Sequence, residues 1–266
     1  MTTAVQYVED EVPVAQTRLY LLKGGADSRT PCLVLHGIEG HEGWLAFHAS
    51  LAESSQVLAP SHPGYGHTPA PEWITSVPHQ AIFYHWYLQQ AGLRQVDLVG
   101  VGMGGWIAAE MAVMDSSRLR HLVLVDAAGL RPRQGEMLDV FITPWRQVIE
   151  RGFLHGADSA EYQRVYSAAP IQDFGGTREA GRTMSMRMCF KPYMHDPSLA
   201  GMLGKITTPT LVVWGEDDAF IPKDCAEQYQ QAIPGATLRT LDNCGHFAHL
   251  DQPQRLAEVL HTFFSS

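Results

Sequence analysis

Two of the three groups that base-assisted acyl chemistry requires are present in this sequence, and the third position is a glycine. Asp218 follows an apolar run at residues 209–214, and His246 lies near the C-terminus. A histidine whose ring N–H is held by a carboxylate can take the proton from a hydroxyl nucleophile. The motif that would carry this hydroxyl, residues 100–104 (GVGMG), has Gly102 at its centre. The sequence therefore predicts a base and its orienting acid without a nucleophile on the chain.

The segment around Gly102 is predicted to form a sharp turn between a strand and a helix. The apolar run at 95–100 is typical of a buried strand, and small residues begin a helix at 103–115. This order matches the G-x-S-x-G elbow, in which the central residue projects from a strained bend at the top of a parallel sheet. Because glycine accepts unusual φ and ψ angles at little cost, we expect the turn to form without a serine.

Two upstream segments have the composition of loops that follow buried strands. Residues 32–35 (CLVL) lead into 36–40 (HGIEG), and residues 62–66 (HPGYG) follow the next predicted strand. With the elbow, the acid and the histidine in that chain order, these motifs resemble the α/β-hydrolase family over nearly the whole chain except its middle. The resemblance implies an α/β fold: a mostly parallel eight-stranded sheet flanked by helices, with a helical cap inserted after strand 6.

The resemblance also implies a role for each site residue. Gly102 occupies the nucleophile position, His246 is the general base, and Asp218 is the acid that fixes the tautomer of the histidine. The backbone N–H groups of Ile38 and Met103 would form an oxyanion hole. Such donors do not depend on side-chain identity, so an anion-stabilising site can persist without a nucleophile. No cofactor and no metal are expected.

Two other carboxylates offer alternatives for the acid. Asp217 is the immediate neighbour of Asp218. Asp126 ends another predicted strand, where some members of the family place the acid. The alternative role for each of these carboxylates is that of a turn or helix-cap residue. The W-G-x-x-D spacing that precedes the histidine loop favours Asp218.

The remaining histidines and the cysteines give little indication of a metal site. His36 begins the oxyanion loop and is expected to be structural. The pair His41-Glu42 suggests a metal ligand set, but no third ligand follows at a suitable spacing. The cysteines are widely spread and without CxxC spacing, which predicts reduced packing thiols. They are Cys32, Cys189, Cys225 and Cys244.

Composition excludes several function classes. A formal net charge of -9 and a sequence pI of about 5.8 are unfavourable for binding nucleic acid, because that affinity comes from clustered Lys and Arg. The N-terminus has neither the basic nor the apolar region of a signal peptide, and no apolar stretch approaches the length that spans a bilayer. We expect a cytoplasmic protein with no membrane partner. The sequence leaves open whether the chain forms a homodimer.

Apolar runs and helical spacing predict the order of the elements. Residues 4–23 form two extended segments of an edge hairpin, and the strands that follow lack alternation, as expected for a sheet buried on both faces. The strand candidates are 31–35, 56–60, 95–100, 120–126, 209–214 and 236–241. The helix candidates are 42–54, 78–91, 103–115, 223–232 and 253–264.

The middle of the chain, residues 131–206, is predicted to be the helical cap, and residues 1–130 and 207–266 the hydrolase core. It has no clear buried strand, and its helix-compatible stretches are 136–153, 158–167 and 177–189. Its large apolar side chains suit the lining of a pocket, although most are expected simply to pack the cap on the core. These side chains are Phe141, Trp145, Phe153, Tyr162, Tyr166, Phe174, Met184, Met186, Met188, Phe190 and Tyr193.

The resemblance is to the branch that contains meta-cleavage C–C hydrolases and carboxylesterases, acting on a small to medium apolar carbonyl compound. The bond is left open among ester, lactone, thioester, amide and C–C. Three explanations of Gly102 compete: a deliberate inactivation of a serine enzyme, a natural loss that yields a ligand-binding pseudo-hydrolase, and lyase or oxygenase chemistry that uses the His–Asp base without a cofactor. Because the rest of the motif set persists, we favour an inactivated hydrolase.

Overall fold

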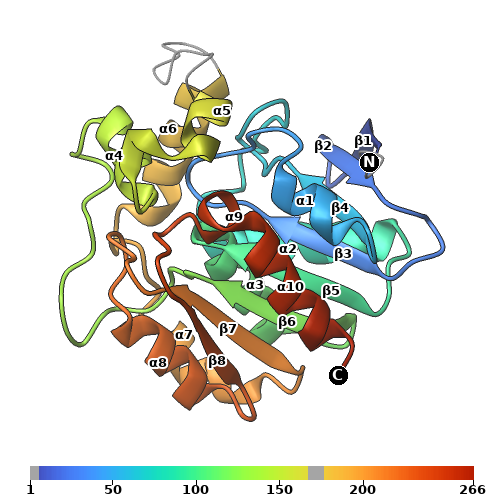
Figure 1. Ribbon diagram of the computed structural model, residues 1–266. Helices are drawn as coiled ribbons and strands as arrows, with labels where there is room; N and C mark the ends of the chain where they lie inside the picture. Colours follow the sequence, from blue (N-terminus) through green and yellow to red (C-terminus); the bar gives the residue numbers. More distant parts are fainter. Residues whose placement is uncertain (1–5, 167–176) are drawn as a thin grey trace.

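The computed structural model describes residues 6–166 and 177–266, and these residues build one eight-stranded sheet (Figure 1). The strand order is β1-β2-β4-β3-β5-β6-β7-β8. At one edge, β1 (Tyr7–Val14) and β2 (Thr17–Gly24) pair antiparallel, and β2 pairs antiparallel with β4. All other pairings are parallel. The predicted mostly parallel sheet with an edge hairpin is confirmed.

The parallel strands form where the sequence has short, mostly apolar segments, except for the edge strand β8, in which Thr237 and Arg239 are exposed. They are β3 (Pro31–Leu35), β4 (Gln56–Pro60), β5 (Val96–Val101), β6 (Leu119–Val125), β7 (Thr210–Gly215) and β8 (Thr237–Leu241). Successive side chains of a strand point to opposite faces. Leu33 and Leu35 accordingly join one buried cluster, and Cys32 and Val34 join the other. A strand needs an apolar side chain at every position only when both faces are covered.

Helices cover both faces of the sheet (Figure 1). On one face, α1 (Ala46–Leu51) packs against α10 (Pro253–Phe264). The other face is covered by α2 (Val77–Gln90), α3 (Met103–Met114) and α8 (Asp224–Ala232). Among the described residues, no helix combines the length and apolar character needed to cross a bilayer.

Two predicted helices are shorter than the sequence suggested. The helix expected at 42–54 is α1, which begins only at Ala46, because Gly40 and Gly43 hold the preceding loop at φ values of 93° and 81°. The helix expected at 136–153 is α4 (Trp145–Gly152), which begins directly after Pro144. A proline cannot donate an i→i−4 hydrogen bond, so it sits at the start of a helix and not inside it.

The segment between β6 and β7 carries the predicted cap. Its helices α4, α5 (Ala160–Tyr166) and α6 (Thr177–Cys189) gather at one end of the sheet (Figure 1). Both ends of the segment are bonded to the core: the N–H of Leu138 donates to the carbonyl of Phe220 at 2.9 Å, and the N–H of Asp196 donates to Gly129 at 3.0 Å. The segment then returns to the core through α7 (Leu199–Met202) and a short 3₁₀ turn, Leu203–Lys205.

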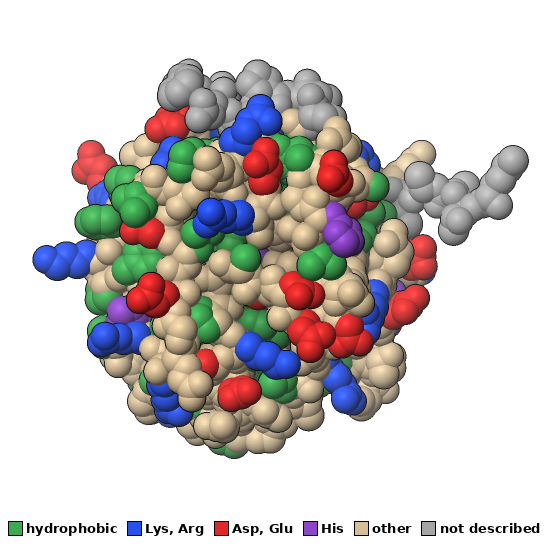
Figure 2. Space-filling model, turned by 60° about the vertical axis from the view of Figure 1, so that its left-hand side comes forward, with side chains coloured by type: hydrophobic (Ala, Val, Ile, Leu, Met, Phe, Trp, Pro, Cys, Tyr) green, Lys and Arg blue, Asp and Glu red, His purple; other side chains and the backbone are tan. Residues whose placement is uncertain are grey.

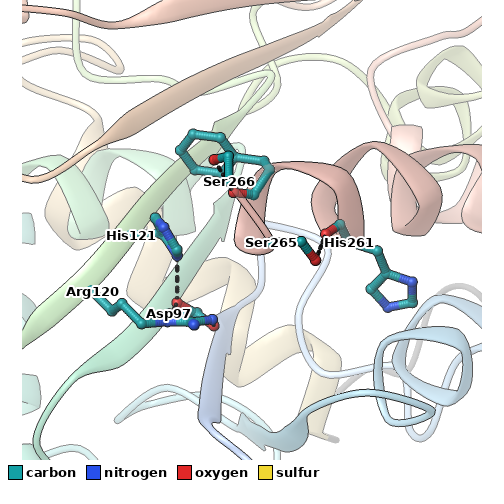
Figure 3. A network of polar contacts seen from close by, with 7 residues as sticks. Asp97, Arg120, His121, His261, Ser265 and Ser266 are labelled. Carbon is teal, nitrogen blue, oxygen red and sulfur yellow. Dashed lines mark hydrogen bonds and ion pairs between the residues drawn. The ribbon is translucent and has the colours of Figure 1, made fainter.

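Asp97, Arg120 and His121 form a buried ionic cluster (Figure 3), which lies at the end of the sheet away from α4, α5 and α6. Asp97, fully buried near the start of β5, accepts hydrogen bonds from the guanidinium of Arg120 and lies 2.9 Å from Nδ1 of His121. The ring of His121 stacks on Phe264 of α10, with centroids 5.6 Å apart. This cluster joins two neighbouring strands to the C-terminal helix.

Candidate active site

Gly102 forms the turn between β5 and α3, as predicted. Its backbone has φ 53° and ψ −116°, and the positive φ lies in the region that favours glycine. The N–H of Gly102 donates to Val125 at 2.9 Å, and its carbonyl accepts from Ala128 at 3.0 Å. Because the end of β6 and the loop after it bind both sides of the turn, its geometry is set by the fold and not by a residue 102 side chain.

The elbow also needs glycine at a second position for a different reason. A Cβ on Gly104 would lie 2.2 Å from the carbonyl oxygen of Leu35, which is closer than any side chain tolerates. The first turn of α3 therefore packs directly on the end of β3. This close approach brings the start of α3 next to the loop that carries Ile38.

His246 and Asp218 form a buried pair. Nδ1 of His246 lies 2.9 Å from Oδ2 of Asp218, and both side chains are almost fully buried. The other carboxylate oxygen, Oδ1, accepts the N–H groups of Phe220 at 2.7 Å and Ile221 at 3.0 Å. With every oxygen engaged, the carboxylate is held in place and assigns the proton of the imidazole to Nδ1. Nε2 is then free to accept a proton.

The free nitrogen of His246 points at the elbow. A Cβ atom built on Gly102 would lie 3.3 Å from Nε2 and 3.6 Å from the Cα of Gly37. A hydroxyl carried on that Cβ would be within hydrogen-bond reach of the base. The ring of Phe220 stacks on His246 with centroids 4.3 Å apart and limits its rotation.

The structure pairs His246 with Asp218 and not with the two alternative acids. Asp217 is exposed. Asp126 is fully buried at the end of β6, but its Oδ1 accepts the N–H of Gly215 at 2.7 Å. Burial, reinforced by the nearby charge of Asp218, raises the pKa of Asp126 well above its ordinary value. Asp126 thus links the end of β6 to β7 through this hydrogen bond.

The two predicted oxyanion donors lie on either side of the elbow. Ile38 belongs to the loop after β3, and Met103 is the first residue of α3, where helical N–H groups have no intrahelical acceptor. In the described part of the chain, neither N–H has a hydrogen-bond acceptor. Both residues line the same small cavity as His246. Two unengaged amides beside a base are suited to holding a developing oxyanion.

The cavity at this site lies between residues of the elbow and histidine loops and residues of the segment 131–206. Its volume is about 10 Å³, which is room for roughly one water molecule. The cap contributes mainly apolar side chains, and Tyr193 is the one residue of the predicted cap set among them. The lining residues are Ile38, Met103, Met137, Leu138, Val140, Tyr193, Met194, Phe220, Ile221 and His246.

Most of the other predicted cap side chains pack and do not line this cavity. Met184 lies on an open groove of about 650 Å³ between α6 and residues 64–70. Met186 and Phe190 are exposed, and Phe174 lies outside the described residues. The buried packing residues are Phe141, Trp145, Phe153, Tyr162, Tyr166 and Met188.

A buried acid and histidine next to the oxyanion loop were missed from the sequence. Glu39 accepts the N–H of Gly37 at 2.8 Å, and His249 lies 3.6 Å from it on the short helix α9 (Ala248–Asp251). Burial raises the pKa of Glu39 to about 7 and lowers that of His249 to about 3. Below pH 7 both groups are therefore mostly neutral. The only sequence signal was the unusual acid inside the loop at 36–40.

The other histidines of this region have structural partners. Nε2 of His36 accepts the N–H of His62 at 3.1 Å, and the two rings stack with centroids 3.8 Å apart. His41 contacts the carbonyl of Ala59 at 3.1 Å, while Glu42 forms a 2.8 Å ion pair with Arg178 of α6. Within residues 6–166 and 177–266, no three His, Cys, Asp or Glu side chains are grouped as metal ligands.

Similarities to known proteins extend over the whole fold. Residues 32–259 match the family described as the alpha/beta hydrolase family. The chain is 25% identical to monoacylglycerol lipase abhd6-A of Xenopus laevis, over 93% of this chain and 79% of the relative. It is 24% identical to 2-hydroxy-6-oxo-6-(2'-aminophenyl)hexa-2,4-dienoic acid hydrolase of Metapseudomonas resinovorans, over 100% of this chain and 97% of the relative.

A solved structure shares the fold. It is 2-hydroxy-6-oxo-6-phenylhexa-2,4-dienoate hydrolase from Rhodococcus sp. strain RHA1, with a TM-score of 0.83 at 21% identity. The match covers 98% of this chain and 100% of that chain.

Proposed function

Because this chain belongs to the α/β-hydrolase family, we propose that its site binds a small to medium apolar carbonyl compound and that Gly102 prevents covalent turnover. One observation carries the proposal. Nε2 of His246 lies 3.3 Å from the place where a residue 102 Cβ would be, which supports the assignment of His246 as the base that a residue 102 hydroxyl would need.

In the serine form of the site, the steps follow from this geometry. The residue 102 hydroxyl gives its proton to His246 and attacks the carbonyl carbon, while Asp218 stabilises the imidazolium. The amides of Ile38 and Met103 hold the tetrahedral oxyanion. Collapse breaks the bond to the leaving group, which takes the proton from His246, and leaves an acyl group on residue 102. Water that gives a proton to His246 then attacks the acyl group and releases it as an acid, and the proton returns to the residue 102 oxygen.

The nature of the ligand is inferred from the walls of the site. The cavity beside His246 is lined mainly by apolar side chains, and the segment 131–206 is proposed to roof it as a cap. Figure 2 shows basic and acidic side chains interspersed on the face that carries the cap, with apolar side chains between them. This mixture gives no single-sign field to steer a highly charged substrate. Ester, lactone and C–C bonds remain candidates, since the relatives include one named as a monoacylglycerol lipase, 25% identical, and one named as a dienoic acid hydrolase, 24% identical.

A second candidate function rests on the intact base. The His246–Asp218 pair could abstract a substrate proton in a lyase or oxygenase reaction that needs no nucleophile on the chain. A non-catalytic ligand-binding protein is the third alternative. Both differ from the first in one respect: neither would gain activity when residue 102 becomes serine.

The test is therefore Gly102→Ser, with Gly102→Ala as the matched control. We expect the serine form to hydrolyse short p-nitrophenyl esters or a vinylogous diketone acid with multiple turnovers. The glycine form and the alanine form should be slower by about 10⁶-fold, as in triads without a nucleophile. Failure of the serine form on every carbonyl substrate tried would reject a serine-hydrolase origin and favour one of the other two functions.

A further inference from the structure

The peptide unit between Gly37 and Ile38 is held in one orientation. It carries the carbonyl of Gly37 on one side and, on the other, the N–H of Ile38, one of the two proposed oxyanion donors. The carbonyl oxygen lies 2.7 Å from Nδ1 of His36 and accepts the N–H of Gly40 at 3.3 Å. In a planar trans peptide the N–H points away from the carbonyl, and this peptide bond is trans. Holding the carbonyl therefore also sets the direction of the Ile38 N–H.

The side chain of Glu39 holds the other end of Gly37. Its Oε1 atom accepts the N–H of Gly37 at 2.8 Å, so the side chain bends back over its own loop. Its second oxygen, Oε2, takes up the space beside the Cα of Gly37, because a Cβ atom built there would lie only 2.2 Å from it. The Cα of Gly37 is in turn 3.6 Å from the position of a Cβ on residue 102. The carboxyl group thus binds the part of the loop that packs against the elbow.

The carboxyl group of Glu39 is itself held in place. It is buried, and Nε2 of His249 lies 3.6 Å from its Oε1. The ring of His249 packs edge-on between Phe47 and Phe247, with centroids 6.5 and 6.1 Å away. A buried polar group left without its hydrogen bond costs about 1–3 kcal/mol. The bond from the N–H of Gly37 to Glu39 is therefore expected to persist in the folded chain.

We propose that Glu39 is a positioning residue: by holding the N–H of Gly37, it fixes the loop so that the N–H of Ile38 faces the oxygen of a bound carbonyl compound. The inference rests on the proposed function, because it concerns the same oxyanion site. It deepens that function by naming a side chain that acts through the backbone and touches no ligand. A carboxyl group that only filled space could be replaced by leucine without loss of turnover.

The kinetic effect of losing this contact follows from when the oxyanion forms. The donor stabilises charge that develops in the transition state, so a misplaced donor lowers kcat and leaves KM nearly unchanged. A displacement of about 1 Å costs on the order of 10²-fold in rate. Glutamine at position 39 keeps an oxygen that can accept the N–H of Gly37. It also matches the charge of the native side chain below pH 7, because burial raises the pKa of Glu39 to about 7.

The experiment compares Glu39→Leu and Glu39→Gln in the Gly102→Ser background on one p-nitrophenyl ester below pH 7. The matched control is Glu110→Leu, because Glu110 is also buried, accepts the N–H of Trp106 at 3.0 Å and has a pKa raised by burial to about 7. It lies about 10 Å along α3 from Met103. We expect Glu39→Leu to lower kcat by about 10²-fold at nearly constant KM, whereas Glu39→Gln and Glu110→Leu keep it. Urea unfolding of each variant checks that it is folded at the assay temperature.

A second measurement needs no turnover and uses the glycine form. In its ¹⁵N–¹H NMR spectrum, the amide of Gly37 should exchange with solvent slowly, because the carboxyl group of Glu39 protects it. Glu39→Leu should speed this exchange and broaden the amide signal of Ile38, since the loop then samples more than one orientation. Glu39→Gln should restore both signals.

Three kinetic results would overturn the positioning role. They are an undiminished kcat in Glu39→Leu, an equal loss in Glu39→Gln, which would assign the effect to charge, and an equal loss in Glu110→Leu, which would assign it to general destabilisation. If Gly102→Ser is inert on every carbonyl substrate, the proposed function fails, and the amide signals of the glycine form decide about Glu39. Unchanged signals of Gly37 and Ile38 in Glu39→Leu would then overturn this inference as well, whereas altered signals that Glu39→Gln restores would support it.

Discussion

His246 Nε2 lies 3.3 Å from the position that a Cβ atom would occupy on Gly102. This nitrogen thus faces a residue that has no side-chain hydroxyl to deprotonate. Its ring is held by Asp218 through Nδ1 and by the stacked ring of Phe220. The orientation of the His246 ring is consequently set by these contacts and does not depend on the residue at position 102.

The acid partner can be tested in the Gly102→Ser background. Asp218→Asn should lower kcat by about 10⁴-fold, because an amide no longer fixes the reactive tautomer of His246. Asp126→Asn should change kcat little, since Nδ1 of His246 is bonded to Asp218 and an amide oxygen at position 126 can still accept the N–H of Gly215. Steady-state rates of the two variants on one p-nitrophenyl ester show which carboxylate is the partner of His246. The reverse ranking of the two variants would move the acid to the end of β6.

Ligand binding should survive in the glycine form. The proposed oxyanion donors are backbone groups of Ile38 and Met103, and glycine enlarges the cavity compared with serine. The affinity for a carboxylate product should therefore differ between the glycine form and Gly102→Ser by no more than about 1 kcal/mol, the worth of one hydrogen bond. Isothermal titration calorimetry on both forms measures this difference. Absence of binding to the glycine form alone would show that the hydroxyl is needed to hold the ligand.

Stability should fall at acid pH because several buried histidines are held neutral. Burial lowers the pKa of His48, His62 and His249 to about 3 each. The unfolded chain binds these protons from about pH 6.5 downward, whereas the folded chain does not until about pH 3. The stability they contribute is complete above pH 6.5 and is lost progressively below it, by up to about 1.4 kcal/mol per histidine per pH unit.

Two buried acids act in the opposite direction. Burial raises the pKa of Glu39 and Glu110 to about 7, so each favours the folded state below about pH 4.5 and loses that contribution as the pH rises from about 4.5 to 7. The decline on acidification should therefore be shallow between pH 6.5 and 4.5 and steeper below. Urea unfolding from pH 4 to 8 measures the slope. His48→Gln removes one of the groups and should flatten it by about one proton; an unchanged slope would contradict the assignment.

The ionic cluster at the far end of the sheet should matter for stability alone. Asp97→Asn removes the buried charge that Arg120 and His121 share, and breaking such a pair costs about 3 kcal/mol of the free energy of unfolding. Strand β5 separates Asp97 from Gly102 by about 16 Å at the usual rise per residue. In the serine form, kcat should therefore be unchanged at 25 °C, while urea denaturation shifts to lower concentration. A large loss of kcat with unaltered stability would be the contrary result.

Local patterns determined much of this protein. The apolar segments predicted the ends of the parallel strands to within one residue. This works best for β3 to β7, whose two faces are both buried and therefore carry mostly apolar side chains. The glycines of residues 100–104 predicted the elbow, since close backbone approach and a positive φ exclude larger residues. Pro144 shortened a helix that helical spacing alone had made too long.

The tertiary structure decided which groups meet. Asp126 and Asp218 end adjacent strands with similar sequences, and only the direction of the loop after β7 brings Asp218 to His246. A second pair, Asp97 and His121, has the same 2.9 Å contact at the wrong end of the sheet, without an elbow or oxyanion loop beside it. Contact between residues far apart in the sequence depends on strand order and burial, which no local spacing encodes. For the same reason, the burial that shifts the pKa values of Glu39 and His249 became apparent only in the folded chain.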